Sequence, residues 1–252
     1  MKPLLAALTL FLAGLSLSPA AAADLTCFEL RTYHASEGKL DALNARFRDH
    51  TMALFEKHGM SNVGYWVPQE NTGQTLVYLL AYPDRAAREV SWKAFLADPV
   101  WLAAKAESEK DGKLVAKVES LFLNLTDYSP KLPITSVKAP RLFEMRVYTT
   151  LPGKLAALDT RFRDHTVALF AKHGMTNLPY FHLDEGQPGA GTTLLYFLAH
   201  DSLEAQKASF DAFRGDPDWI AARDASEKDG KLLIEKGVVS TLLDATDYSP
   251  AK

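Results

Sequence analysis

The sequence predicts an α+β protein of two tandem ferredoxin-like domains, each with the order βαββαβ, that pack into an intramolecular dimeric α/β-barrel-like pseudo-dimer. The first observation behind this prediction is an internal duplication, because residues 28–60 and 143–175 align without a gap and are identical at 22 of 33 positions. The second is the order of strand and helix patterns in each copy. The third is one strand per copy that is apolar or aromatic throughout. Since the repeat is far longer than a solenoid turn, each copy should be a small domain.

The first strand and the first helix follow from local patterns. Residues 25–33 (LTCFELRTY) have the aromatic and β-branched content of a strand. A helix should run from Gly38 to Gly59, and Gly59 suits the left-handed position after a helix end. The predicted buried face of this helix recurs at spacings of three and four residues and consists of Leu40, Leu43, Phe47, His50 and Leu54.

The rest of each copy predicts a hairpin, further helix and a last strand. The hairpin strands are 62–67 and 74–82, and a helix follows over about 84–96. Asp98 and Pro99 then suit the N-cap and first position of another helical stretch that ends near residue 112. A strand at 118–128 closes the copy. The second copy repeats this order, with three extra residues in its hairpin loop.

The apolar strands predict that the two copies face each other. A four-stranded sheet with its helices on one face leaves the other face bare. Yet Leu76–Tyr82 and Leu194–Ala199 are apolar or aromatic throughout, so both of their faces require burial. The predicted domains are therefore residues 24–130 and 141–252. They are joined by a linker at 131–140, within a stretch (PKLPITSVKAP) that holds three prolines.

The N-terminal segment resembles a targeting signal. Lys2, an apolar run at 4–17 and an alanine-rich end at 20–23 are typical of a cleavable signal peptide over residues 1–23. The run is shorter than the roughly 20 residues that a membrane span needs. We therefore expect a periplasmic or secreted protein with no membrane span.

Charge and composition narrow the partners. Beyond residue 23 there are 27 basic and 31 acidic side chains, which argues against a nucleic-acid partner. The single cysteine cannot form an internal disulfide. A small-molecule ligand and self-association into a homo-oligomer both stay open.

A row of polar side chains on the first strand is the main candidate site. Alternation places Glu29, Arg31 and Tyr33 on one strand face, and we expect that face to line the space between the two sheets. The second copy repeats the row as Glu144, Arg146 and Tyr148. Two interpretations stand: a pocket whose arginines hold an anionic or carbonyl group, or a structural ion pair that fixes sheet register.

Histidines supply the other candidates. His50 and His165 fall on the apolar stripe of the first helix and should lie near the polar row, either as a base or ligand or as core histidines. His182 and His200 occur in the second copy only, where we expect exposed strand ends. There is no HEXXH, no cysteine cluster and no nucleotide-binding fingerprint, so we expect no metal and no cofactor.

Four motifs, each present twice and in the same order, carry a family resemblance. They are FELRTY, the RFRDH helix ending in KHGM, the AFxxDPxW turn and the closing TDYSP. Together they resemble the NIPSNAP family over nearly all of the chain beyond residue 23. The resemblance implies the dimeric α+β barrel superfamily, which also includes haem-degrading and cofactor-free monooxygenases, chlorite dismutases and small-ligand binders. The family has no assigned chemistry, so it implies a fold more than a function.

Three hypotheses for function follow. The first is a binding protein that holds a small apolar or aromatic ligand in a cavity between the sheets. The second is a cofactor-independent, monooxygenase-like enzyme. The third is a structural or interaction protein whose core is filled by side chains and whose apolar surface is exposed.

Overall fold

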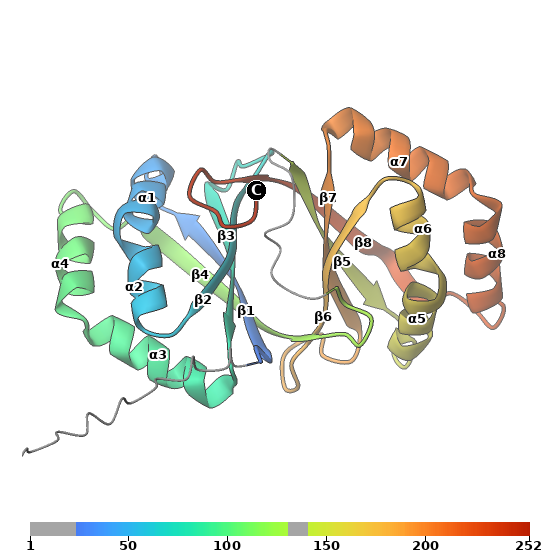
Figure 1. The fold of residues 1–252 in the computed structure, drawn as a ribbon, viewed down its shortest axis with the longest axis horizontal. Coiled ribbons are helices and arrows are strands. Elements are labelled where there is room, and N and C mark those ends of the chain that lie inside the picture. Colours follow the sequence, from blue (N-terminus) through green and yellow to red (C-terminus); the bar gives the residue numbers. More distant parts are fainter. Residues whose placement is uncertain (1–23, 131–140) are drawn as a thin grey trace, which may run out of the picture.

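A computed structural model describes residues 24–130 and 141–252. The predicted signal peptide and linker lie outside these residues. Figure 1 shows one central barrel, with the helices of the two repeats on its opposite sides. The elements of the first repeat are β1 (Cys27–Ala35), α1 (Leu40–Arg46), η1 (Phe47–Thr51), α2 (Met52–Lys57), β2 (Ser61–Pro68), β3 (Thr75–Tyr82), α3 (Arg85–Ala97), α4 (Pro99–Ser108) and β4 (Val115–Leu125).

The second repeat has the same order. Its elements are β5 (Leu142–Thr150), α5 (Leu155–Arg161), η2 (Phe162–Thr166), α6 (Val167–Lys172), β6 (Thr176–Leu183), β7 (Thr193–His200), α7 (Leu203–Gly215), α8 (Pro217–Ser226) and β8 (Leu233–Ala245). The predicted first helix ends as expected, with Gly59 at a φ of +79°. Within that helix, however, both repeats contain a π-helical turn, η1 or η2, that the sequence did not predict.

The strands close into one barrel in the order β1-β3-β2-β8-β5-β7-β6-β4, and every pair is antiparallel. Each repeat contributes four neighbouring strands. The two seams between the repeats are short: β2 pairs with β8 over Trp66–Pro68, and β4 pairs with β6 over Leu123–Leu125. The two copies therefore fold against each other, as the apolar strands predict.

The closing TDYSP motif of each repeat docks on the other repeat. Arg48 holds Asp247 through two hydrogen bonds of 2.7 Å, and the backbone amide of Tyr65 donates to Ser249 Oγ at 2.9 Å. Arg163 and Asp127 form the reciprocal pair, at 2.6 and 2.9 Å. These reciprocal tails add to the short seams, so the repeats are held together from both sides.

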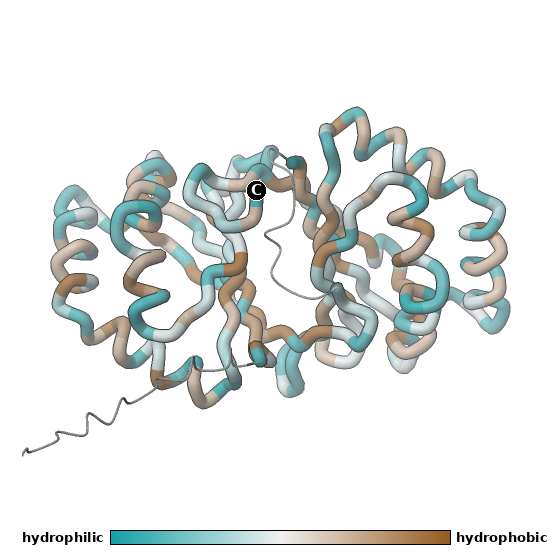
Figure 2. Tube along the Cα trace, in the orientation of Figure 1, coloured by the Kyte–Doolittle hydropathy of each residue, from teal (hydrophilic) through white to brown (hydrophobic). Residues whose placement is uncertain are grey.

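The barrel interior is filled by apolar side chains from both repeats. Phe28 of β1 lies 5.3 Å from Phe181 of β6, and Trp66 of β2 lies 5.3 Å from Phe197 of β7, between ring centroids. Hydrophobic residues concentrate on these central strands in Figure 2. Leu30, Leu79, Phe143, Leu195 and Leu243 belong to the same buried cluster.

The filled interior shows that the polar row does not line the space between the sheets, so the direction expected from the sequence was wrong. Phe28 and Leu30 point into the barrel, so Glu29, Arg31 and Tyr33 point the other way, toward the helices. The row formed by Glu144, Arg146 and Tyr148 is oriented in the same way. An ion pair is costly in an apolar interior, whereas the helix side supplies partners for it.

Candidate functional site

The Glu29 carboxylate is the centre of a buried polar cluster between β1 and α3. Arg88 of α3 donates two hydrogen bonds to it, at 2.8 and 2.9 Å, and Arg31 forms an ion pair with it. Ser120 Oγ and Tyr82 Oη also donate, at 2.7 and 3.1 Å. Burial alone would raise the pKa of Glu29, but the hydrogen bond from Arg88 and the charge of Arg31 outweigh it and lower the pKa to about 2.

Arg31 extends this cluster toward two tyrosines and a tryptophan. Its Nε donates to Tyr78 Oη at 2.9 Å and its Nη2 donates to Tyr33 Oη at 3.4 Å. Its guanidinium carbon lies 4.4 Å from the ring centroid of Trp92, which is a cation–π distance. Arg31 therefore forms an ion pair with Glu29, as one of the two interpretations expects, and it also packs against aromatic rings.

The equivalent carboxylate of the second repeat, Glu144, has different partners. Arg146 pairs with it, and Ser240 Oγ donates at 2.6 Å. His200 Nε2 lies at 2.9 Å and Gln206 Nε2 at 3.3 Å, at the positions that Tyr82 and Arg88 occupy in the first repeat. Burial again would raise the pKa of Glu144, but the hydrogen bond with His200 and the charge of Arg146 lower it to about 2.

The position of His200 differs from the one expected from the sequence. An exposed strand-end position was expected, but the side chain is only 1% exposed and belongs to the Glu144 cluster. The pairing of β7 with β5 explains this, since Leu142 faces His200 across the ladder and Glu144 follows on the same side. His182 lies differently, half-buried at 2.9 Å from Asp159 Oδ1.

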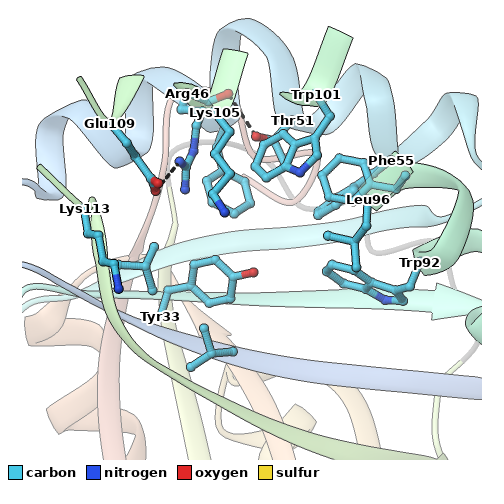
Figure 3. Close-up of a pocket in the computed structure, with 14 residues that line it drawn as sticks. Tyr33, Arg46, Thr51, Phe55, Trp92, Leu96, Trp101, Lys105, Glu109 and Lys113 are labelled. Atoms are coloured by element: carbon cyan, nitrogen blue, oxygen red, sulfur yellow. Dashed lines mark hydrogen bonds and ion pairs between the residues drawn. The ribbon is translucent and has the colours of Figure 1, made fainter. Parts of the chain in front are cut away.

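A cavity of about 330 Å³ adjoins the first cluster, between the sheet and the helices of the first repeat. In Figure 3, side chains from the helices, including Arg46, Lys105 and Trp101, lie above it and Tyr33 lies below. Its walls are largely aromatic and apolar: Tyr33, Phe47, Phe55, Trp92, Phe95, Leu96, Trp101, Val115 and Val118. Polar groups reach it from Arg46, Thr51, Lys105, Glu109 and Lys113.

Arg46 was not among the predicted site residues, yet it is a buried cation in the wall of this cavity. Its Nη1 donates to Glu109 Oε1 at 2.9 Å, and its guanidinium carbon lies 5.2 Å from the ring centroid of Trp101. Its Nε is buried and has no hydrogen-bond acceptor among the described residues. The π turn helps to position it, because Thr51 Oγ1 donates to the Arg46 carbonyl at 3.1 Å.

The predicted histidines of the first helix do not join this site. His50 and His165 are exposed and lie in the π turns. The buried position four residues after Phe47 is occupied by Thr51 instead, and Thr166 is its counterpart. The prediction of a buried His50 was therefore wrong, because a π turn holds one more residue than an α turn. His165 lines a separate surface groove with Asp164 and Leu169.

The other repeated histidines tie helices together. His58 Nε2 lies 2.7 Å from Asp98 Oδ2, and His173 Nε2 lies 2.6 Å from Asp216 Oδ2. Within residues 24–130 and 141–252, no group of three or more histidine, cysteine or acidic side chains has a geometry that could hold a metal ion. The same residues include no helix long and apolar enough to cross a membrane.

Comparisons with solved structures identify the fold. A candidate monooxygenase from Fusobacterium nucleatum is 12% identical, with a TM-score of 0.55 over 88% of this chain and 92% of that one. An anthrone oxidase-like protein is 13% identical, with a TM-score of 0.55 over 91% and 95%. An uncharacterised NIPSNAP domain protein from Burkholderia xenovorans is 24% identical over 42% of this chain and 99% of its own, with a TM-score of 0.37.

No curated protein matches this chain. The NIPSNAP family model, in contrast, matches both repeats, over residues 28–130 and 143–250. These two matches include the Glu29 and Glu144 clusters, the cavity and both TDYSP tails. The chain therefore belongs to the NIPSNAP family, as a tandem duplication of its domain.

Proposed function

We propose that this chain is a small-molecule-binding protein whose site is the cavity between the sheet and the helices of the first repeat. The observation that carries the proposal is an aromatic cavity of about 330 Å³ beside a fixed cluster of charged and hydroxyl groups. This volume falls within the range of small-molecule pockets, which combine apolar walls with a few placed polar groups. The ligand would be small and apolar or aromatic.

The proposed site lies on the outer side of the barrel, whereas the sequence predicted a cavity in its interior. The interior is occupied by side chains such as Trp66, Phe181 and Phe197, so a ligand between the sheets would have to displace core residues. A filled interior is also what the structural-protein hypothesis expects, and Val90, Val100 and Leu102 are exposed on α3 and α4. The open cavity beneath those helices favours binding over assembly.

A second candidate is an enzyme that oxidises the bound ligand. The candidate monooxygenase and the anthrone oxidase-like protein favour it, because both share the barrel over most of their length. Tyr33 and Glu109 are among the groups of the cavity that could exchange a proton with a phenolic ligand. Oxygen consumption in the presence of anthrone would separate this candidate from a binder.

Three further expectations belong to the same proposal. The strand order β4-β1-β3-β2 supports a ferredoxin-like description of each repeat. Export to the periplasm or outside the cell rests on the signal-like residues 1–23. The intact mass of the exported protein would test it, and we expect the mass of a chain that begins at Asp24. Self-association beyond the pseudo-dimer would be measured by light scattering.

The binding proposal is tested by filling the cavity. Val118 lines it and is 44% exposed, so Val118→Trp should block the cavity at little cost in stability. Val238 is the counterpart in the second repeat and is 41% exposed, which makes Val238→Trp the matched control. We expect aromatic fragments detected by ligand-observed NMR to lose binding in Val118→Trp and to keep it in Val238→Trp. Fragments that bind equally to both variants would contradict the proposal.

A further inference from the structure

We propose that the ligand of this cavity is an anion with an aromatic or apolar body, such as an aryl carboxylate or a phenolate. This inference rests on the proposed function and adds the charge of the ligand to it. The geometry assigns Lys105 and Lys113 as the groups that recognise the charge, with Arg46 behind them. The aromatic walls would hold the body of the ligand.

The charges that face the cavity are Arg46, Lys105, Lys113 and Glu109. Three are cationic, and the single carboxylate, Glu109, is already paired with Arg46 at 2.9 Å. Neither Lys105 nor Lys113 has a carboxylate within 4.0 Å among the described residues. The cavity therefore presents an excess of positive charge that the surrounding side chains do not neutralise.

Arg46 adds a buried donor that lacks an acceptor. The residue is only 5% exposed, and its Nε–H has no partner among the described residues. A buried donor without an acceptor is destabilising, and an acceptor on the ligand would remove that cost. Because the guanidinium is charged, an anionic oxygen is the acceptor that would bind it best.

The second repeat gives an internal comparison. Arg161 Nε is also buried without an acceptor among the described residues, so the repeats differ in their other two cations and not in this donor. Arg223 and Lys231 stand at the positions of Lys105 and Lys113. There Arg223 pairs with Asp224 at 2.8 Å, and Lys231 lies 3.6 Å from Glu227. Asp224 corresponds to Ala106 in the first repeat. The cations are therefore neutralised in the second repeat and left unpaired in the first.

A further difference concerns the wall of the cavity. Leu96, which is 54% exposed, lines the cavity in the first repeat, and Arg214 occupies its position in the second. Arg214 pairs with Asp211 at 2.5 Å, and its guanidinium carbon lies 5.9 Å from the Phe210 ring centroid. At this one wall position the apolar side chain is therefore present only in the repeat whose lysines are unpaired. The two differences together favour the first repeat as the site of anion recognition.

The test uses two probes of nearly equal shape, 2-naphthoate and the neutral 2-naphthamide, titrated calorimetrically into the full chain. We expect 2-naphthoate to bind at least about tenfold more tightly than 2-naphthamide, which is about 1.4 kcal/mol. The preference should decrease as salt is added, because the lysines are exposed. In the variant Lys105→Gln/Lys113→Gln the two affinities should become nearly equal, through a loss for 2-naphthoate alone.

The control variant is Arg223→Gln/Lys231→Gln, which removes the equivalent cations of the second repeat and should keep the full preference. Equal or tighter binding of 2-naphthamide by the unmodified chain would overturn the inference. So would a preference that survives in Lys105→Gln/Lys113→Gln, or no binding of 2-naphthoate. The proposed function would still stand if Val118→Trp abolished 2-naphthamide binding, and it would fail if Val118→Trp changed the binding of neither probe.

Discussion

Glu29 and Glu144 are equivalent residues that depend on different cations. Glu29 is paired with two arginines, Arg31 and Arg88, whereas among the described residues Glu144 is paired with one arginine, Arg146. We expect Arg146→Ala to lower the free energy of unfolding by about 3–5 kcal/mol, because it strands a buried carboxylate. Arg31→Ala should cost less, about 1–3 kcal/mol, since Arg88 stays in place. Denaturant unfolding of both variants measures the difference.

The double variant Glu144→Gln/Arg146→Met is the control for that experiment. It removes both charges, so it should recover most of the stability that Arg146→Ala loses. If Arg146→Ala unfolds no more easily than Arg31→Ala, the different partners of the two clusters do not matter for stability. Full stability in both single variants would instead favour an open ligand pocket at this row.

The same carboxylates predict an acid-sensitive stability. Both have folded pKa values of about 2, below the ordinary value of 4.5. A depressed pKa contributes stability that is fully present above about pH 4.5 and is lost as the pH falls toward 2. Each carboxylate should account for about 3 kcal/mol over that window. Melts of Glu29→Gln between pH 5 and 2 should have a shallower slope than those of the unmodified chain, and an unchanged slope would count against the assignment.

At the scale of elements, Asp98 joins two helices of the first repeat. Its carboxylate accepts the Val100 amide at 2.8 Å as the N-cap of α4 and also binds Lys57 and His58 at the end of α2. We expect Asp98→Ala to lower stability by about 2 kcal/mol, and Asp98→Asn by less, because asparagine keeps the cap. Asp216→Ala and Asp216→Asn in the second repeat should give the same order in thermal melts. Equal losses for the alanine and asparagine variants would show that the charge outweighs the cap.

The sequence predicts most of the elements but not the direction in which the polar row faces. The strands, the helix ends at Gly59 and Asp98 and the hairpin all follow from local patterns that the structure repeats. Alternation correctly separates Glu29 and Arg31 from Phe28 and Leu30, but it does not say which set faces the barrel. The neighbouring strand Leu76–Tyr82 is apolar or aromatic on both faces, so it gives no direction either. The burial of Arg46 and the exposure of His50 depend on a π turn, which no residue pattern in the sequence predicts.

At the scale of the whole molecule, the two repeats close one barrel within a single chain. A fragment of residues 24–130 would expose the barrel face of Phe28 and Trp66 and the unpaired edges of β2 and β4. We expect it to form a homodimer, or to aggregate, when its mass is measured by light scattering. A monodisperse, stable monomer would contradict the barrel. Arg48→Ala/Arg163→Ala in the full chain should loosen the contact between repeats and lower the midpoint of thermal unfolding.

The tandem arrangement has an evolutionary consequence. In a homodimer every substitution appears in both subunits at once, so a change that helps one site must be tolerated by the other. Here Tyr82 in one half stands opposite His200 at the equivalent position of the other half, and Leu96 likewise corresponds to Arg214. Duplication and fusion of the gene thus free the two halves from symmetry. Related chains with this arrangement should accumulate differences around the cavity faster than in the reciprocal tails, where both halves still need the same contacts.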